Sequence, residues 1–211
     1  MVLAMDTAPL PASTRAALDL LISHPLHVPD IKGRADRRVR RGQVLFRESD
    51  RSCGVYLVTL GTFKVSLALD DGREQVTSFP IAGDLLGLDA LPCGFHQCTA
   101  TALEDCQVCH LPFVPVRDRD TLPVEAFNRL LRLAAEEKVR DLQLRVCLVN
   151  CHSDGRVAWF LLQWSARMRE RGWSGREFEL RMLRSDIGSY VGLSAESVSR
   201  ALAAYVRRGW I

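Results

Sequence analysis

The sequence of 211 residues lacks any apolar run long enough to cross a membrane. No stretch approaches the roughly 20 consecutive apolar residues that a membrane-spanning helix needs. Its first residues, MVLAMDTAPLPAST, contain no basic stretch leading into an apolar segment, so no signal peptide is expected. The 7 cysteines are odd in number and show no framework spacing, which is typical of reduced thiols and not of disulfides. We therefore expect a cytoplasmic protein with no membrane partner.

The sequence also lacks the short motifs of common enzyme classes. It contains no HExxH, nucleophile elbow, P-loop or GxGxxG, so no catalytic residue is expected. Residue types that bind metals do occur close together in one segment, at His96, Cys98, Cys106, Cys109 and His110. A structural zinc-binding protein or a thiol-redox protein is therefore an alternative that the residues leave open.

Basic residues concentrate near the end of the chain. The net charge is +3, but residues 156–211 contain 10 arginines against 5 acidic residues, whereas residues 1–155 contain 18 Lys+Arg against 20 Asp+Glu. Uneven positive charge of this kind is typical of a nucleic-acid contact. A solvated basic face is the alternative that charge alone leaves open.

The segment from about Val39 to Leu111 shows the pattern of short strands joined by tight turns. Its strands are rich in β-branched and aromatic residues, and Asp70-Asp71-Gly72 is a strong hairpin signal. The expected strands include VLF (44–46), VYLVTL (55–60), FKVSLAL (63–69) and EQVTSF (74–79). Many short strands at regular intervals predict a sandwich or a barrel.

Residues 123–150 change to a helical period. One stripe at steps of three and four is apolar throughout: Leu131, Ala135, Val139, Leu142, Val146 and Val149. A second stripe beside it is apolar at its ends and charged in its middle: Leu131, Ala134, Lys138, Asp141, Arg145 and Leu148. A helix of this length between two compact segments predicts a connector and dimerisation element. An amphipathic helix packed on its own domain is the alternative.

Residues 156–211 are predicted to be helical again and to end in a helix-turn-helix. VAWFLLQWSARM (157–168) is apolar enough to be buried, and RGWSGREFEL is expected to lead into a short strand. We expect Ser185 to cap the next helix, Gly192 to end it and Ser194 to cap the last one.

The last predicted helix has a face suited to a DNA major groove. The helical period directs Val198, Leu202 and Tyr205 inward and leaves Glu196, Ser199, Arg200 and Ala203 on the outer face. Arg200 suits a bidentate contact to guanine, and Glu196 can accept a hydrogen bond from a cytosine amino group. On spacing alone, two packed helices with a solvated face remain the alternative.

The string SDIGSYVGLSAESVSRAL resembles the recognition region of the CRP/FNR family of bacterial transcription regulators, in its FNR branch. The resemblance continues through SARMRERGWSGREFEL, PIAGDLLGLDAL and ALEDCQVCHLPF and covers about Val39 to Ile211. It implies an α+β fold with three parts. These are an N-terminal helix plus a β-roll sensor domain of the cyclic-nucleotide-binding type (1–122), a dimerisation helix (123–150) and a winged helix-turn-helix DNA-binding domain (151–211).

The family continues into a β-hairpin wing after its recognition helix, whereas this sequence ends at Ile211. If the wing is missing, backbone contacts are lost, and we expect DNA affinity to fall more than sequence preference.

The resemblance also implies partners. In the FNR branch the pattern Glu-x-x-Ser-Arg reads a TTGAT half-site, and a homodimer reads an inverted repeat in double-stranded DNA with half-site centres about one helical turn apart. The matching residues here are Glu196, Ser199 and Arg200, with Ser194 and Ser197 as further DNA-binding candidates. RNA polymerase contacts carry over by position to Gly83, Asp84, Asp105 and the 170–177 loop.

The cofactor is not identified by these residues. Where cAMP-binding relatives carry Gly-Glu-Leu and later Arg-Ser, this sequence has Gly87-Leu88-Asp89 and His96-Gln97, so cAMP is not expected. FNR regulators hold a [4Fe-4S] cluster on one central and three N-terminal cysteines. Cys109 matches the central ligand and is the candidate sensor or metal residue, but no cysteine precedes Cys53, so the pattern does not support a cluster. Oxygen, redox or nitrogen-oxide signals are the expected class.

Two further expectations concern single side chains. Side chains alternate along a strand, so Cys106 and Cys109 should point to opposite faces and should not clasp one ion. By resemblance, Asp141 faces its twin across the dimer axis, where like charges repel. Lys138 and Arg145 lie one turn away on either side and could offset that repulsion, so we expect a dimer without a cluster.

Overall fold

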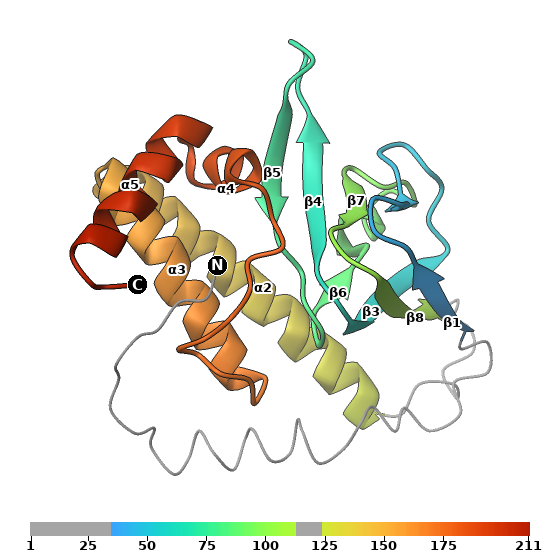
Figure 1. The fold of residues 1–211 in the computed structure, drawn as a ribbon. Helices are drawn as coiled ribbons and strands as arrows, with labels where there is room; N and C mark the ends of the chain where they lie inside the picture. Colours follow the sequence, from blue (N-terminus) through green and yellow to red (C-terminus); the bar gives the residue numbers. More distant parts are fainter. Residues whose placement is uncertain (1–34, 113–123) are drawn as a thin grey trace. The chain divides into compact units, whose positions relative to one another are not determined.

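The computed structural model describes residues 35–112 and 124–211, which belong to two compact units (Figure 1). The first unit holds the described residues up to Gln143, and the second runs from Leu144 to Ile211. The division therefore falls inside the helix predicted over 123–150, and the domain limits at 122 and 150 remain a prediction. The predicted N-terminal helix lies outside the described residues.

Two antiparallel four-stranded sheets build the first unit, with strand orders β1-β8-β3-β6 and β2-β7-β4-β5. The expected strands are all present, within one or two residues of their expected ends. Their bounds are β1 Ala35–Val39, β2 Val44–Phe46, β3 Gly54–Leu60, β4 Phe63–Ala68, β5 Glu74–Ser78, β6 Leu85–Leu86, β7 Thr99–Ala102 and β8 Cys106–Pro112, with a short 3-10 turn at Leu88–Ala90.

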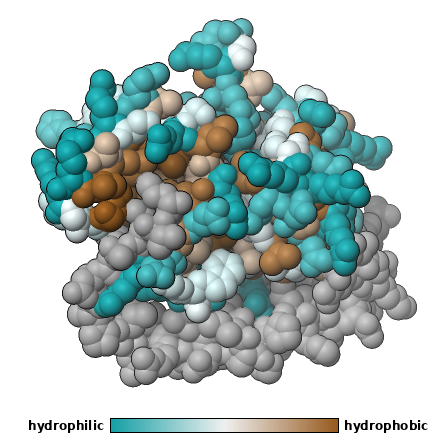
Figure 2. Space-filling model, in the orientation of Figure 1, coloured by the Kyte–Doolittle hydropathy of each residue, from teal (hydrophilic) through white to brown (hydrophobic). Residues whose placement is uncertain are grey.

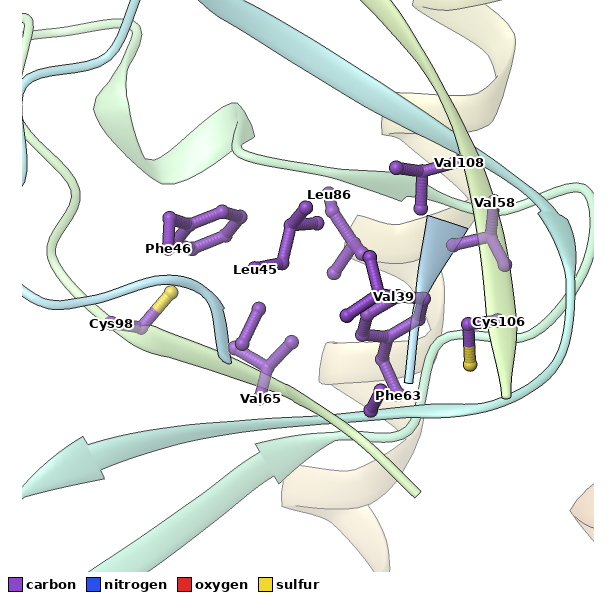
Figure 3. Close-up of a cluster of buried hydrophobic side chains, with 12 residues drawn as sticks. Val39, Leu45, Phe46, Val58, Phe63, Val65, Leu86, Cys98, Cys106 and Val108 are labelled. Atoms are coloured by element: carbon purple, nitrogen blue, oxygen red, sulfur yellow. The ribbon is translucent and has the colours of Figure 1, made fainter. Parts of the chain in front are cut away.

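The core of this unit lies between the two sheets and takes side chains from both (Figure 3). Phe63 of one sheet and Val58 and Val108 of the other are essentially inaccessible to solvent. Burial of side chains of this size contributes about 1.5–3 kcal/mol each. Alternating apolar residues on short strands therefore give one continuous core, as the sequence pattern predicts.

The β4–β5 hairpin projects from the sheets and ends in the predicted turn (Figure 1). Gly72 has a φ of +80°, a value that glycine adopts without a Cβ penalty, and its N–H donates to the carbonyl of Leu69 at 2.9 Å. Asp71 and Arg73 at the tip form an exposed ion pair at 2.7 Å. The tip is accordingly hydrophilic, as the top of Figure 2 shows.

Four helices follow: α2 (Val124–Asn150), α3 (Ser153–Glu170), α4 (Arg184–Val191) and α5 (Ala195–Arg207). The long helix and the terminal helix pair are confirmed. The short strand expected from EFEL is wrong, because residues 177–183 form no strand and the described part of the second unit offers no strand to pair with it. No helix of the described ranges is long and apolar enough to span a bilayer.

Candidate nucleic-acid interface

The helix pair α4–α5 begins with a cap that the sequence did not reveal. The helix starts at Arg184, so Ser185, the expected cap, lies inside its first turn. The Leu183 N–H donates instead to Oδ2 of Asp186 at 3.0 Å. Asp186 is buried, and its carboxylate also lies where the helix dipole favours negative charge.

The turn between α4 and α5 is built around two glycines. Gly192 ends α4 in the left-handed region at φ +66°, as expected for a glycine after a helix. A Cβ on Gly188 would lie 2.5 Å from the carbonyl oxygen of Leu193, so no larger residue fits there. Ser194 caps α5 as predicted, since its Oγ accepts from the Ser197 N–H at 3.2 Å. The turn therefore holds the two helices at close range.

The faces of α5 divide as the helical period predicts. Val198, Leu202 and Tyr205 are buried, whereas Glu196, Arg200 and Ala203 are exposed. Ser199 is half-buried, and its Oγ donates to the Ala195 carbonyl at 2.8 Å. The structure thus presents Glu196 and Arg200 side by side on one solvent-exposed surface.

Neighbouring groups interact with both of these side chains. Nη2 of Arg200 donates to Oγ of Ser197 at 3.0 Å, one turn earlier on α5. The pKa of Glu196 is lowered, first by a hydrogen bond from its own backbone N–H, then by Ser194 and by the nearby Arg200 charge. Glu196 is therefore ionised at neutral pH and can act only as an acceptor, which is what a cytosine amino group requires.

The cysteines of the CQVCH segment separate. Cys106 lies in the core between the sheets (Figure 3), where its Sγ contacts the carbonyls of Glu104 and Thr62 at 3.2 and 3.4 Å. Cys109 is also buried but outside that cluster, on the strand face opposite to Cys106, as predicted. Burial raises the pKa of the Cys106 thiol, which disfavours the reactive thiolate.

The metal-ligating residue types of this segment do not converge. His96 is buried and stacks on Phe46 with ring centroids 3.7 Å apart, and Cys98 lies in the core (Figure 3). Within residues 35–112 and 124–211, no three His, Cys, Asp or Glu side chains form a group that could hold a metal ion. All 7 cysteines fall in those ranges, so these residues do not fit a [4Fe-4S] cluster.

A cavity of about 280 Å³ lies in the first unit between the β-strands and α2. Phe46, Leu67 and Leu86 contribute apolar walls. Three carboxylate side chains, Asp89, Glu137 and Asp141, complete a lining that includes no lysine, arginine or histidine. Burial, followed by nearby carboxylates and despite Arg140, raises the pKa of Glu137 to about 7. An anionic ligand would meet repulsion here and find no cation.

In the 80–89 loop, the expected exposure of Asp84 is wrong. Asp84, expected to touch RNA polymerase, is buried; its carboxylate accepts from the Ile81 N–H at 2.9 Å and pairs with Arg140 at 3.2 Å. Its side chain therefore holds the loop together and does not face a partner. Gly83 is half-buried, and Asp105 is exposed but accepts from the Arg41 N–H at 2.9 Å.

The two predicted stripes of α2 differ in exposure, and the dimer interface remains a prediction. The fully apolar stripe is exposed along its length, from 50% at Leu142 to 83% at Val149. In the second stripe Leu131, Lys138 and Arg145 are exposed, but Ala134, Asp141 and Leu148 are half-buried.

Two of these half-buried residues face other parts of their own chain. Asp141 lines the cavity, and its position opposite its twin in a dimer remains a prediction. Leu148 reaches the helix-turn-helix, since a Cβ on Gly192 would lie 3.7 Å from its Cδ2. The spacing of residues along α2 could not predict which side chains are half-buried, because the elements that pack against the helix determine its buried face.

Both units of the chain match known protein families. Residues 36–118 match the cyclic nucleotide-binding domain, and residues 155–211 match the Crp-like helix-turn-helix domain. The chain is 36% identical to the fumarate and nitrate reduction regulatory protein of Escherichia coli (strain K12) over 173 residues, which is 82% of this chain and 69% of that protein. The chain belongs to the CRP/FNR family. It is a DNA-binding transcription regulator of that family and not an enzyme.

Solved structures of the CRP/FNR family share this fold. FixK2 from Bradyrhizobium japonicum is 28% identical and superposes with a TM-score of 0.72, covering 83% of this chain and 86% of that one. TTHB099, a CRP-family transcriptional regulator from Thermus thermophilus, gives a TM-score of 0.66 at 22% identity, covering 82% and 85%. The β-roll and helix-turn-helix predicted from the sequence are confirmed.

Proposed function

We propose that this CRP/FNR regulator binds TTGAT-type inverted repeats as a symmetric homodimer. The observation that carries the proposal is the exposed surface of α5, where Glu196 and Arg200 stand one turn apart with no bulky side chain at Ala203. That spacing suits neighbouring bases in a major groove: an arginine fork for guanine and a carboxylate for cytosine. Ser194 and Ser197 lie at the start of α5, where short polar groups suit the sugar-phosphate backbone, and Ser199 completes the Glu-x-x-Ser-Arg pattern.

The exposed stripe of α2 supports the dimer. Ala135, Val139, Leu142, Val146 and Val149 alternate at steps of four and three, the heptad spacing of a two-stranded coiled coil. We call these five residues the α2 seam. Exposed apolar side chains in such a row are costly in water and favour a second copy of the same helix. Lys138 and Arg145 flank the α2 seam, where they remain solvated.

The test of this proposal is a fluorescence-anisotropy titration. A TTGAT-N4-ATCAA duplex and a scrambled duplex of equal length and composition are titrated at the same salt concentration, because phosphate contacts make affinity salt-dependent. We expect tighter binding to the inverted repeat. Equal affinity for the two duplexes would defeat the proposed specificity.

The lining of the cavity limits which effector molecules it can bind. A cyclic nucleotide carries a phosphate, and a phosphate site needs donors such as arginine. The lining offers Asp89, Glu137 and Asp141 instead. We therefore propose that cAMP is not the effector. Isothermal titration with cAMP should give no binding heat, and DNA affinity should not change when cAMP is added.

We propose that oxygen, redox or nitrogen-oxide signals act through accessible thiols. Cys53 is exposed, and its Sγ lies 3.7 Å from Nε2 of His110, so an oxidant can reach this thiol. The buried Cys98, Cys106 and Cys109 are shielded from oxidants by comparison. Peroxide treatment followed by mass spectrometry should modify Cys53 before Cys106. Equal modification of both would contradict this assignment.

Polymerase contact is proposed for the surface around Asp105 and the 170–177 loop. Asp105 is exposed, and so is most of the 172–177 segment. Transcription assays on a promoter with the inverted repeat, comparing wild type with Asp105→Ala, would test this at equal DNA occupancy. Unchanged transcript levels would exclude Asp105.

A further inference from the structure

Arg156 lies in the first turn of α3, and its guanidinium reaches the ends of two other helices. Nη2 donates to the Leu148 carbonyl at 2.8 Å in the last turn of α2, and Nε donates to the Cys151 carbonyl at 3.0 Å just after it. Nη1 lies 3.4 Å from the carbonyl oxygens of both Val191 and Gly192, where α4 ends. One side chain therefore joins the end of α2 to the turn of the helix-turn-helix.

Helix ends make this contact favourable. The last four carbonyls of a helix have no partner within the helix, and a positive charge beside them interacts well with the helix dipole. A guanidinium has five N–H donors in a rigid planar fork, so it can serve two helix ends at once. A lysine ammonium at the same place keeps the charge but is a single point and cannot span both ends.

The backbone of the turn closes around this side chain. A Cβ on Gly192 would lie 3.4 Å from Nη1 of Arg156 and 3.7 Å from Cδ2 of Leu148. Gly192 thus lies near both the guanidinium of Arg156 and the side chain of Leu148. The hydrogen bonds of Arg156 therefore connect the end of α4 to the last turn of α2.

From this we infer that Arg156 is a positioning residue that determines the half-site spacing that the dimer accepts. The inference rests on the proposed dimer. Val146 and Val149 of the α2 seam belong to the same last turns of α2 that Arg156 binds, so the partner's place is fixed there. Arg156 then fixes α4 on those turns, and α5 follows α4 through the tight Gly188–Leu193 contact. Each recognition helix is thereby held at one distance from the dimer axis.

The test measures spacing preference separately from base preference. Wild type, Arg156→Lys and Arg156→Gln are titrated against inverted repeats with spacers of two to six base pairs and against a single half-site. A shift of one base pair rotates a half-site by about 35° around the duplex, so a rigid dimer should prefer one spacer. Because a charged hydrogen bond contributes about a factor of ten, we expect roughly tenfold discrimination in wild type and a nearly flat profile in both variants.

Binding to the single half-site separates a positioning role from a merely structural one, because a damaged helix-turn-helix would bind it more weakly. Its affinity, and the penalty for replacing its guanine, should be unchanged in both variants, which shows that the helix-turn-helix is folded. Arg181→Lys is the matched control, because Arg181 is exposed and pairs with Glu179 on the surface; its profile should follow wild type.

The outcomes separate failure of the positioning role of Arg156 from failure of the proposed function. A wild-type spacer profile in Arg156→Lys and Arg156→Gln would overturn the positioning role. Loss of half-site binding in both variants would also overturn it, because Arg156 would then support the fold of the unit and not its placement. If wild type itself does not prefer TTGAT repeats over the scrambled duplex, the proposed function fails instead.

Discussion

The guanidinium of Arg140 on α2 lies 3.2 Å from the carboxylate of Asp84, which is only 3% exposed. The two residues are 56 positions apart in the chain. The pair closes the 80–89 loop onto α2 within the first unit, and Asp84 also accepts from the Ile81 N–H.

Removing one partner should destabilise the first unit. We expect Arg140→Ala to lower the free energy of unfolding by roughly 2–4 kcal/mol, because it removes a charged partner of a buried carboxylate. Urea denaturation measures this. Arg73→Ala, which breaks the exposed pair with Asp71, should be indistinguishable from wild type. An equal effect of both substitutions would show that burial of Asp84 does not matter.

Arg200→Ala should weaken discrimination at the guanine of the half-site. Loss of a bidentate contact is expected to reduce the preference for the correct base by about 1–3 kcal/mol. Anisotropy titrations against duplexes substituted at that base measure it. Arg200→Lys is the matched variant: it keeps the charge and most of the non-specific affinity but should lose the preference. A variant that keeps full base preference would remove Arg200 from the recognition surface.

Leu142→Glu should convert the dimer to a monomer. It places a charge in the middle of the α2 seam, where two copies would face each other across the axis. Sedimentation of metal-free protein at micromolar concentration reads the outcome. Leu60→Glu is the control, since Leu60 is 54% exposed on β3 and lies outside the α2 seam. A dimeric Leu142→Glu variant would place the interface elsewhere.

Glu137 should make stability depend on pH. Its pKa rises from 4.5 to about 7 on folding, so between these values the native state holds a proton that the unfolded state has released. Stability linked to this group is therefore present below about pH 4.5 and falls as pH rises toward 7. Glu137→Gln should remove this loss and be more stable than wild type at pH 8, by about 1–3 kcal/mol. Thermal unfolding at pH 5 and pH 8 measures the difference. A slope that persists in Glu137→Gln would assign it to another group.

The fold and the exposed face of α5 were predictable because their signals are local. Strand and helix periods, the Asp71-Gly72 turn and the Gly192 break depend on neighbours in the chain. The exposure of Glu196 and Arg200 follows from the helical period alone, once Val198 and Leu202 point inward.

The errors lie where distant contacts decide. An aspartate in a turn is expected to be exposed, yet Asp84 is buried and pairs with Arg140. Ser185 is a good capping residue, but Asp186 reaches back to Leu183, and the cap of α4 lies two positions earlier than expected. None of these partners can be identified from spacing along one segment.

The exposed α2 seam also makes formation of the proposed dimer depend on protein concentration. A helix that buries its apolar side chains only against a second copy makes assembly a matter of mass action. At concentrations below the dissociation constant of the dimer, occupancy of an inverted repeat should rise with the square of the protein concentration, whereas a preformed dimer gives a linear rise. For the proposed dimer, the amount of this regulator in a cell would therefore itself be an input to transcription, alongside any chemical signal.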